Sequence, residues 1–493
     1  MDVGAGTVTL WAAARLASIH MQKLTFLLFA LFCFAYALFT QDNVSHNTYC
    51  RAVMTANLVQ HGRVDINAYE GRTEDKAYRA GNYYCDKAPG MSFLGMPAAF
   101  AFTRLFPITP ETPYNRIWSA FLYLCALTTS GLFSALAAVL LFQYILRRTQ
   151  DVHAALAASI AFGLGTPVWG WATSFFSHSA TAALLVTGFI ALDAAKRALA
   201  ANGRASGLAL VGGLAFGAAT AVEYTAFVPS AIIGAAFALT SPWDRPIDVL
   251  RMFAISAAGA LVALVPVLIF HAAAFGSAFS TGYAFTVVYD AHRAGLFGIG
   301  SPRMDVLGKL LVSPERGVVW YAPIVVAMAW AVGLMMRRTE LRMTAIVTIV
   351  IAAWYLVMNS GFEYWHGGAS TGPRYLTSAV GFAALALGLA WPHFSVWQRR
   401  SALVLLGISV FVNFVCTAVD MTAGGLVEHI APRFLSADLG QTLTYKILER
   451  PSILHFAAPV LVAGIFGWLI CDETKRAERR IKLATEHAPS RRR

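Results

Sequence analysis

The stretch RMFAISAAGALVALVPVLIFHAAAF, residues 251–275, decides the fold. It is apolar over almost its whole length, and a helix needs about 20 such residues to cross the hydrocarbon core of a bilayer. Only helices and closed barrels satisfy every backbone hydrogen bond in lipid, and a barrel strand would instead alternate apolar and polar residues over a shorter stretch. The stretch therefore predicts a transmembrane helix.

Apolar runs of this kind recur along the whole chain. The 493 residues are 57% hydrophobic and only 13% charged, with a mean hydropathy of +0.59, which is too apolar for a soluble domain of this length. The composition and the runs together predict an all-α polytopic bundle of about twelve transmembrane spans. The other predicted spans lie near residues 24–40, 116–146, 152–170, 174–195, 206–222, 225–241, 318–336, 343–359, 374–392, 401–420 and 452–471.

Basic residues give the sidedness. The net charge is +12, but Lys and Arg concentrate in short loops and in the tail 475–493, which is typical of cytoplasmic loops and argues against a nucleic-acid partner. With an even number of spans, every cluster falls on the cytoplasmic side of a bacterial inner membrane. These clusters are Lys23, Arg147–Arg148, Lys196–Arg197, Arg204, Arg245, Arg251, Arg337–Arg338, Arg342, Arg399–Arg400 and the tail.

The spans divide the chain into four predicted regions. A cytoplasmic N-terminus covers 1–23, the main transmembrane module 24–392, further transmembrane helices 393–471 and the basic tail 472–493. The predicted outer, periplasmic loops are 41–115 and 276–317 in the main module and 421–451 in the C-terminal helices. The run 91–105 is short for a crossing, so we expect an interfacial helix there.

The first outer segment places charges at the predicted membrane boundary. Asp42 follows the first span directly, and Asp86 with Lys87 precedes the interfacial helix. A lysine here can neutralise a lipid-linked phosphate, while a carboxylate can accept the proton of an attacking hydroxyl. The alternative is that boundary charges only anchor helix ends.

Two ionisable groups lie at the outer edge of predicted spans. His178 begins one span, and Glu223 with Tyr224 forms the tip of a helical hairpin. Ionisable groups at this depth are costly and usually face a cavity or a partner. A structural histidine and a solvated hairpin tip are the alternatives.

The later outer segments contain the densest polar clusters. Arg316 lies in Ser-Pro-Glu-Arg-Gly just before a span, where its guanidinium could fork onto a phosphate or sugar hydroxyls. The segment GFEYWHGGASTGPRYL, residues 361–376, adds Glu363, Trp365, His366 and Arg374 beside glycines that permit close backbone approach. An aromatic membrane belt would not require the adjacent charged groups.

Cysteine spacing argues against a metal cluster. No CxxC pair or histidine-rich spacing occurs, and no cofactor motif is present. Cys50 and Cys85 share the first outer loop, in an oxidising compartment, so a disulfide between them is expected, with two buried thiols as the alternative. A divalent ion held by carboxylates such as Asp42 and Asp86 stays open.

These motifs, taken in order, resemble bacterial multi-pass glycosyltransferases of the GT-C class, in the mannosyltransferase-like or arabinosyltransferase-like branch. The resemblance runs from Asp42 to about Tyr375. It rests on the acid after the first span, Asp-Lys-Ala-Pro-Gly, Ser-Pro-x-Arg-Gly, Tyr-Trp-x-Gly-Gly and Gly-Pro-Arg-Tyr-Leu.

The resemblance implies an inverting transfer of a hexosyl or pentosyl group from a polyprenyl-phosphate donor to an envelope glycan, lipid or protein. It makes Asp42 the base, with Asp86 as competitor, because the usual paired acids after the first span are missing: Asn43 follows Asp42. It makes Lys87 and Arg316 or Arg374 the phosphate contacts. The expected sugar-binding or acceptor-binding residues are His178, Glu223, Tyr224, Tyr283, Glu363, Trp365 and His366.

Two other functions are compatible with a polytopic bundle. A transporter or flippase for a lipid-linked saccharide predicts charges through the depth of the bundle and on both faces, whereas these gather on one face. A structural subunit of an envelope complex would not need so dense a cluster of Glu, Trp, His and Arg.

The topology is testable with reporter fusions. Fusions after Arg148, Arg204 and Arg400 are expected to report the cytoplasm, and fusions near Gly71 and Gly425 the outside, because positive charge is retained on the cytoplasmic side. A cytoplasmic signal at Gly71 would overturn the map.

Overall fold

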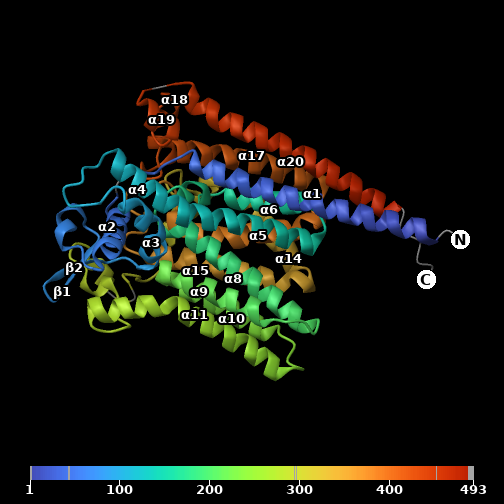
Figure 1. Ribbon diagram of the computed structural model, residues 1–493, viewed down its shortest axis with the longest axis horizontal. Helices are drawn as coiled ribbons and strands as arrows, with labels where there is room; N and C mark the ends of the chain where they lie inside the picture. Colours follow the sequence, from blue (N-terminus) through green and yellow to red (C-terminus); the bar gives the residue numbers. More distant parts are fainter. Residues whose placement is uncertain (1–2, 43–44, 294, 296, 451, 487–493) are drawn as a thin grey trace.

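The computed structural model describes residues 3–42, 45–293, 295, 297–450 and 452–486, with side chains from Ile19 to Arg479 in that part. The described chain is almost entirely helical, with a single two-stranded hairpin, and this confirms the all-α polytopic fold (Figure 1). Residues 487–493, at the end of the predicted basic tail, lie outside the described part.

The helices in the first half of the chain follow the predicted spans closely. They are α1 (Val3–Ala37), α2 (His46–His61), α3 (Gly90–Thr103), α4 (Arg116–Ala126), α5 (Leu132–Thr149), α6 (Val152–Gly163), α7 (Val168–Ala172), α8 (Ser177–Ala200), α9 (Ser206–Val222), α10 (Phe227–Leu239) and α11 (Pro246–Phe275). Short helical turns η1 (Asn67–Arg72), η2 (Leu127–Gly131) and η3 (Tyr224–Ala226) join some of them. Because η2 connects α4 to α5, the predicted run 116–146 is one continuous helix, Arg116–Thr149.

The second half adds shorter elements between the long helices. The long ones are α14 (Val325–Met336), α15 (Thr339–Gly361), α16 (Val380–Ala390), α17 (Val396–Val419) and α20 (Leu454–Glu486). The short ones are η4 (Gly282–Phe285), η5 (Asp290–Arg293), α12 (Met304–Val312), α13 (Val318–Tyr321), η6 (Arg374–Ala379), η7 (Trp391–His393), η8 (Leu426–Ile430), α18 (Ala431–Leu435) and α19 (Leu443–Leu448).

Seven helical stretches in the described chain are long and apolar enough to cross a membrane. They are Ile19–Ala37, Arg116–Thr149, Pro246–Phe275, Thr339–Gly361, Arg374–His393, Val396–Val419 and Leu454–Arg479. Shorter apolar helices include α6, α9 and α14, so the total of about twelve spans stays a prediction. The 14 residues of α3 extend only about 21 Å, less than the hydrocarbon thickness, as expected for the run 91–105.

The bundle has two distinct ends (Figure 1). The first turns of α1 and the last turns of α20 lie at one end, where these two helices pack along each other. At the other end lie α2, the hairpin of β1 (Lys76–Arg79) and β2 (Asn82–Cys85), α18 and α19. We call this the hairpin end. It gathers elements from the predicted outer loops 41–115 and 421–451, as the even span count requires.

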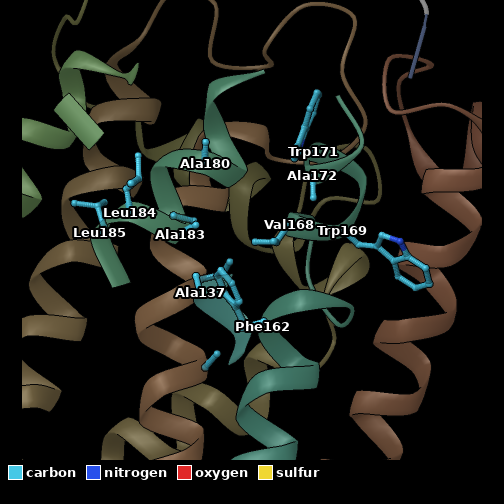
Figure 2. Close-up of a cluster of buried hydrophobic side chains, with 14 of the residues drawn as sticks. Ala137, Phe162, Val168, Trp169, Trp171, Ala172, Ala180, Ala183, Leu184 and Leu185 are labelled. Carbon is cyan, nitrogen blue, oxygen red and sulfur yellow. The ribbon is translucent and has the colours of Figure 1, made fainter. Parts of the chain in front are cut away.

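The core is built from small and aromatic side chains. Figure 2 shows Phe162, Trp169 and Trp171 beside alanines of α5, α7 and α8, and most of these side chains are fully buried. Small residues let helix backbones approach closely, which is the usual basis of packing between membrane helices. At the crossing of α9 and α11, a Cβ on Gly213 would lie 1.8 Å from the Ser256 carbonyl oxygen, so only glycine fits.

A disulfide fixes the hairpin to α2. Cys50 lies in α2 and Cys85 ends β2, and the two sulfurs are bonded with their Cα atoms 5.2 Å apart. The predicted bond is therefore present, and both residues are buried. Since Cys85 is followed directly by Asp86 and Lys87, the bond also sets where these two side chains leave the hairpin.

Removing the disulfide is expected to destabilise the hairpin end. Closing a loop of this length stabilises a fold by about 3–4 kcal/mol in the chain-entropy model, so a Cys50→Ser/Cys85→Ser variant should unfold at lower temperature. The measurement is thermal unfolding in detergent without reductant. Cys471→Ser, at an exposed free cysteine, is the matched control. Full alkylation of Cys50 and Cys85 in the untreated, unreduced protein would contradict the bond.

Candidate functional site

A cavity of about 470 Å³ opens at the hairpin end of the bundle. Its walls come from segments far apart in the sequence: α2, the start of α3, the start of α8, the junction of α9 with η3, the segment after α11 and the loop after α15. Every one of these segments falls in or beside a predicted outer loop. Of the predicted site residues, Lys87, His178, Glu223, Tyr224, Tyr283 and Arg374 line it.

Lys87 is buried in the cavity wall between two carboxylates. Its Nζ lies 3.1 Å from Asp75 Oδ1 and 3.2 Å from Asp86 Oδ1, and it faces the rings of Tyr283 and Tyr289. Burial by itself lowers the pKa of Lys87, but Asp75 and Asp86 more than offset this, so the pKa lies above its usual value. Lys87 therefore stays charged.

Asp86 lies behind Lys87 and is completely buried. Burial raises its pKa to about 6, although Lys87 acts in the opposite direction. The Thr286 hydroxyl donates to its Oδ2 at 3.3 Å, and a Cβ on Gly282 would come within 2.6 Å of the Asp86 Cα. The segment after α11 thus packs directly onto Asp86, which does not line the cavity.

Two arginines bring uncompensated hydrogen-bonding capacity to the cavity. Arg51 projects from α2 and Arg374 begins η6, and the Nε of each is buried without a hydrogen-bond partner among the described residues. Arg374 lies over the rings of Phe176 and Tyr375, at 5.4 Å and 5.0 Å from their centroids. Guanidinium groups held on aromatic faces and short of acceptors are well suited to an anionic ligand.

His178 and Glu223 form a pair in the cavity wall. His178 is the second residue of α8, and its Nδ1 lies 3.1 Å from Glu223 Oε2, at the end of α9. Glu223 is largely buried rather than a solvated hairpin tip, because the tip folds back onto the start of α8. The structure therefore joins two residues that are 45 positions apart.

Aromatic residues cover the rest of the wall. The Tyr224 hydroxyl lies 2.7 Å from His271 Nε2, and Tyr224 packs edge-on against Tyr283. Burial raises the pKa of Tyr283 to about 12. His292 stacks on Phe362, and burial together with the Lys87 charge lowers its pKa to about 4. His292 is thus neutral near pH 7.

Arg316 supports the cavity from behind. It donates to the carbonyl oxygens of Gly368, at 3.2 Å, and Ser370, and so holds the loop 367–370 in place. His366 accepts a hydrogen bond from the Gly368 amide at 2.9 Å. Gly367, Gly368 and Ala369 line the cavity, whereas Arg316 and His366 do not.

Glu363 and Trp365 also lie outside the cavity wall. Glu363 is exposed, and Trp365 packs under Lys309, whose Nζ is 5.5 Å from the ring centroid. In this motif the glycines line the cavity, whereas Glu363 and Trp365 do not. Gly367 and Gly368 adopt positive φ angles, which glycine tolerates without steric cost.

Asp42 does not reach the cavity. Its Oδ1 pairs with Lys446 Nζ of α19 at 2.7 Å, and its Oδ2 accepts from the Ser119 hydroxyl of α4 at 2.8 Å. The end of α1 faces the C-terminal elements, so the carboxylate ties three chain segments together. The expected role of Asp42 as a base is therefore corrected, because the residue lies outside this cavity, and Asp86 does not line the cavity either.

Arg51, Asp75 and His292 line the cavity although the sequence did not single them out. Asp75 lies in a polar stretch typical of a solvated loop, whereas Arg51 precedes the apolar run 52–54 and His292 lies in a mixed segment. Their position in the wall depends on the disulfide and on the segment after α11. Neither of these long-range contacts leaves a pattern in the sequence around the three residues.

One group of potential metal ligands occurs among the described residues: Cys50, Cys85 and Asp86. Because the two cysteines are joined in a disulfide, only one carboxylate remains there. That group does not fit a metal centre.

The charge balance around Lys87 gives a test of stability. Lys87→Met would leave Asp75 and Asp86 buried without their cation, and breaking a buried ion pair typically costs about 3–5 kcal/mol. We expect a clearly lower midpoint of thermal unfolding, partly restored by adding Asp75→Asn. Lys309→Met removes an exposed pair and should change little. Equal stability of the two single variants would contradict this account.

No protein-family model matches this sequence, and no curated protein matches it. Solved structures do match in fold. The crystal structure of ArnT from Cupriavidus metallidurans bound to undecaprenyl phosphate aligns with a TM-score of 0.53 at 14% identity, over 99% of this chain and 77% of that one. The apo state of the same protein aligns with a TM-score of 0.52 at 14% identity, over 93% and 74%. The resemblance to the GT-C class is thereby confirmed at the level of the fold.

Proposed function

We propose that this protein transfers a sugar from a polyprenyl-phosphate donor to an acceptor of the bacterial cell envelope, with inversion, in the periplasmic leaflet of the inner membrane. The observation that carries the proposal is the cavity at the hairpin end, into which Arg51, Lys87 and Arg374 bring positive charge next to aromatic walls. The similarity in fold to ArnT is in keeping with it.

The arginines are the main phosphate contacts in this proposal. Arg51 and Arg374 both line the cavity, so a phosphate bound there would meet two guanidinium groups, which are forked and charged donors. Lys87 adds charge, but Asp75 and Asp86 already neutralise it. Lys87 thus places a fixed ion-paired cation at the cavity wall. Arg316 contributes indirectly, because it holds the loop 367–370 in place.

The aromatic wall suits the sugar. Tyr224, Tyr283 and Phe362 offer ring faces, and the hydroxyl of Tyr283 is kept protonated by burial. Sugars bind by stacking their apolar faces on rings while their hydroxyls find polar partners, and this cavity offers both within one enclosure. The polar partners in this cavity include His178 and Glu223.

The reaction needs positioning and charge neutralisation. The acceptor attacks the anomeric carbon from the face opposite the phosphate, the bond from that carbon to the phosphate oxygen breaks, and its electron pair leaves with the polyprenyl phosphate. The negative charge on that phosphate increases as the bond breaks. Preorganised arginines in a partly dry cavity stabilise that charge more in the transition state than in the bound donor.

The phosphate contact can be measured directly with undecaprenyl phosphate. Arg374→Gln is expected to weaken its binding about 10- to 150-fold, because a hydrogen bond to a charged group contributes about 1.5–3 kcal/mol. Native mass spectrometry of the protein in nanodiscs gives the Kd. The matched control is Arg116→Gln, an exposed arginine paired with Glu449 at the protein surface.

Unchanged affinity in Arg374→Gln would contradict the phosphate site. Binding without release of undecaprenyl phosphate from any sugar-loaded donor would instead favour a transporter or flippase. Glucose, mannose and arabinose linked to undecaprenyl phosphate are suitable donors, since they include hexoses and a pentose.

A further inference from the structure

Two histidines of the cavity wall pair with a carboxylate: His178 pairs with Glu223 and is buried, whereas His46 pairs with Glu74 and both of these side chains are about half exposed. Asp75 is paired with Lys87, and Asp86 lies behind it. His292 has no carboxylate within hydrogen-bonding distance in the described chain. The buried pair is therefore the group to examine for proton transfer.

Glu223 is held rigidly by its neighbours. Its Oε2 lies 3.1 Å from His178 Nδ1 and 3.3 Å from the Thr181 hydroxyl, and its Oε1 accepts from the Thr225 hydroxyl at 3.0 Å. A carboxylate fixed in this way favours the histidine tautomer with a proton on Nδ1. The lone pair of the neutral ring is then on Nε2.

The Nε2 atom is available to a ligand. No described residue hydrogen-bonds it, it is not sealed off among the buried atoms without partners, and His178 lines the cavity. The rings of Trp171, Phe176 and Tyr375 surround the imidazole and fix its plane. A histidine oriented by a carboxylate, with its second nitrogen facing a substrate cavity, is the usual arrangement of a general base.

We infer that His178, oriented by Glu223, is the general base of this site, and that the acceptor is a neutral hydroxyl rather than a phosphate. The inference rests on the proposed function. The acceptor oxygen forms its bond to the anomeric carbon while its proton passes to His178 Nε2. The bond from that carbon to phosphate breaks, polyprenyl phosphate leaves with the electron pair, and Glu223 stabilises the imidazolium.

The acceptor class follows from the chemistry of the proton. A phosphate monoester is already ionised near pH 7 and needs no base to attack, whereas an alcohol keeps its proton until a base removes it. A buried histidine and carboxylate pair would be superfluous for a phosphate acceptor.

The test compares wild type, His178→Gln, Glu223→Gln and His153→Gln in nanodiscs. His153 forms an exposed pair with Glu478, on segments that do not line the cavity, and is the matched control. The donors are glucose, mannose and arabinose on undecaprenyl phosphate. Octyl glucoside offers only hydroxyls as acceptor, octyl phosphate offers an ionised phosphate, and an envelope lipid extract supplies natural acceptors.

The expected result is a kcat about 100- to 10,000-fold lower in His178→Gln with little change in undecaprenyl phosphate binding. The fall of the wild-type rate at acid pH should disappear in this variant, and added imidazole should partly restore turnover in His178→Gly. Glu223→Gln should lose at least about 10-fold in kcat. If His178→Gln does not fold, shown by lost undecaprenyl phosphate binding, the Glu223→Gln result decides.

The outcomes separate this inference from the function beneath it. If His178→Gln transfers sugar at the wild-type rate, the assignment of His178 as the base is overturned and the proposed function stands. The same holds for Glu223→Gln where that variant decides. Transfer to octyl phosphate but not to hydroxyl acceptors overturns the acceptor class alone. No turnover by wild type with any donor overturns the proposed function and the inference with it.

Discussion

The burial of one lysine between two carboxylates is the constraint on which the hairpin end depends. Lys87 leaves the hairpin next to a disulfide and lies between Asp75 and Asp86, in a wall to which α2, the residues after β2 and the segment after α11 all contribute. Charges removed from water are tolerated only in good geometry with compensating partners. The disulfide, the close approach of Gly282 and the Thr286 hydrogen bond all serve to keep that geometry.

The cavity also holds two chemically different kinds of charged group. Lys87 is already compensated, so the electrostatic demand for an anion comes from Arg51 and Arg374, each with an Nε that lacks a partner in the described chain. Glu223, in contrast, is compensated by a histidine rather than by a lysine. A histidine can change its charge near neutral pH, whereas a lysine with a raised pKa cannot. The arginines are thus suited to holding charge and the histidine pair to moving a proton.

Much of this site followed from residue type and position, and some of it did not. The cysteine pair was predicted because both residues share one outer loop, and Lys87, His178, Glu223, Tyr224, Tyr283 and Arg374 do meet at one cavity. Asp42 failed as a base because the end of α1 faces Ser119 and Lys446 rather than the cavity. Arg51, Asp75 and His292 were missed because nothing in their local sequence marks them as residues of a cavity wall.

The sequence by itself determined the class of fold and the face on which polar chemistry gathers, because hydrophobic length and charge asymmetry are local properties that the bilayer imposes on each segment separately. Only the tertiary structure decided which carboxylate meets which cation. Asp42 and Asp86 look alike in sequence, yet one ties α1 to α19 and the other neutralises Lys87. Side-chain partnerships between distant segments depend on helix rotation and on loop packing, and neither is encoded within a window of neighbouring residues.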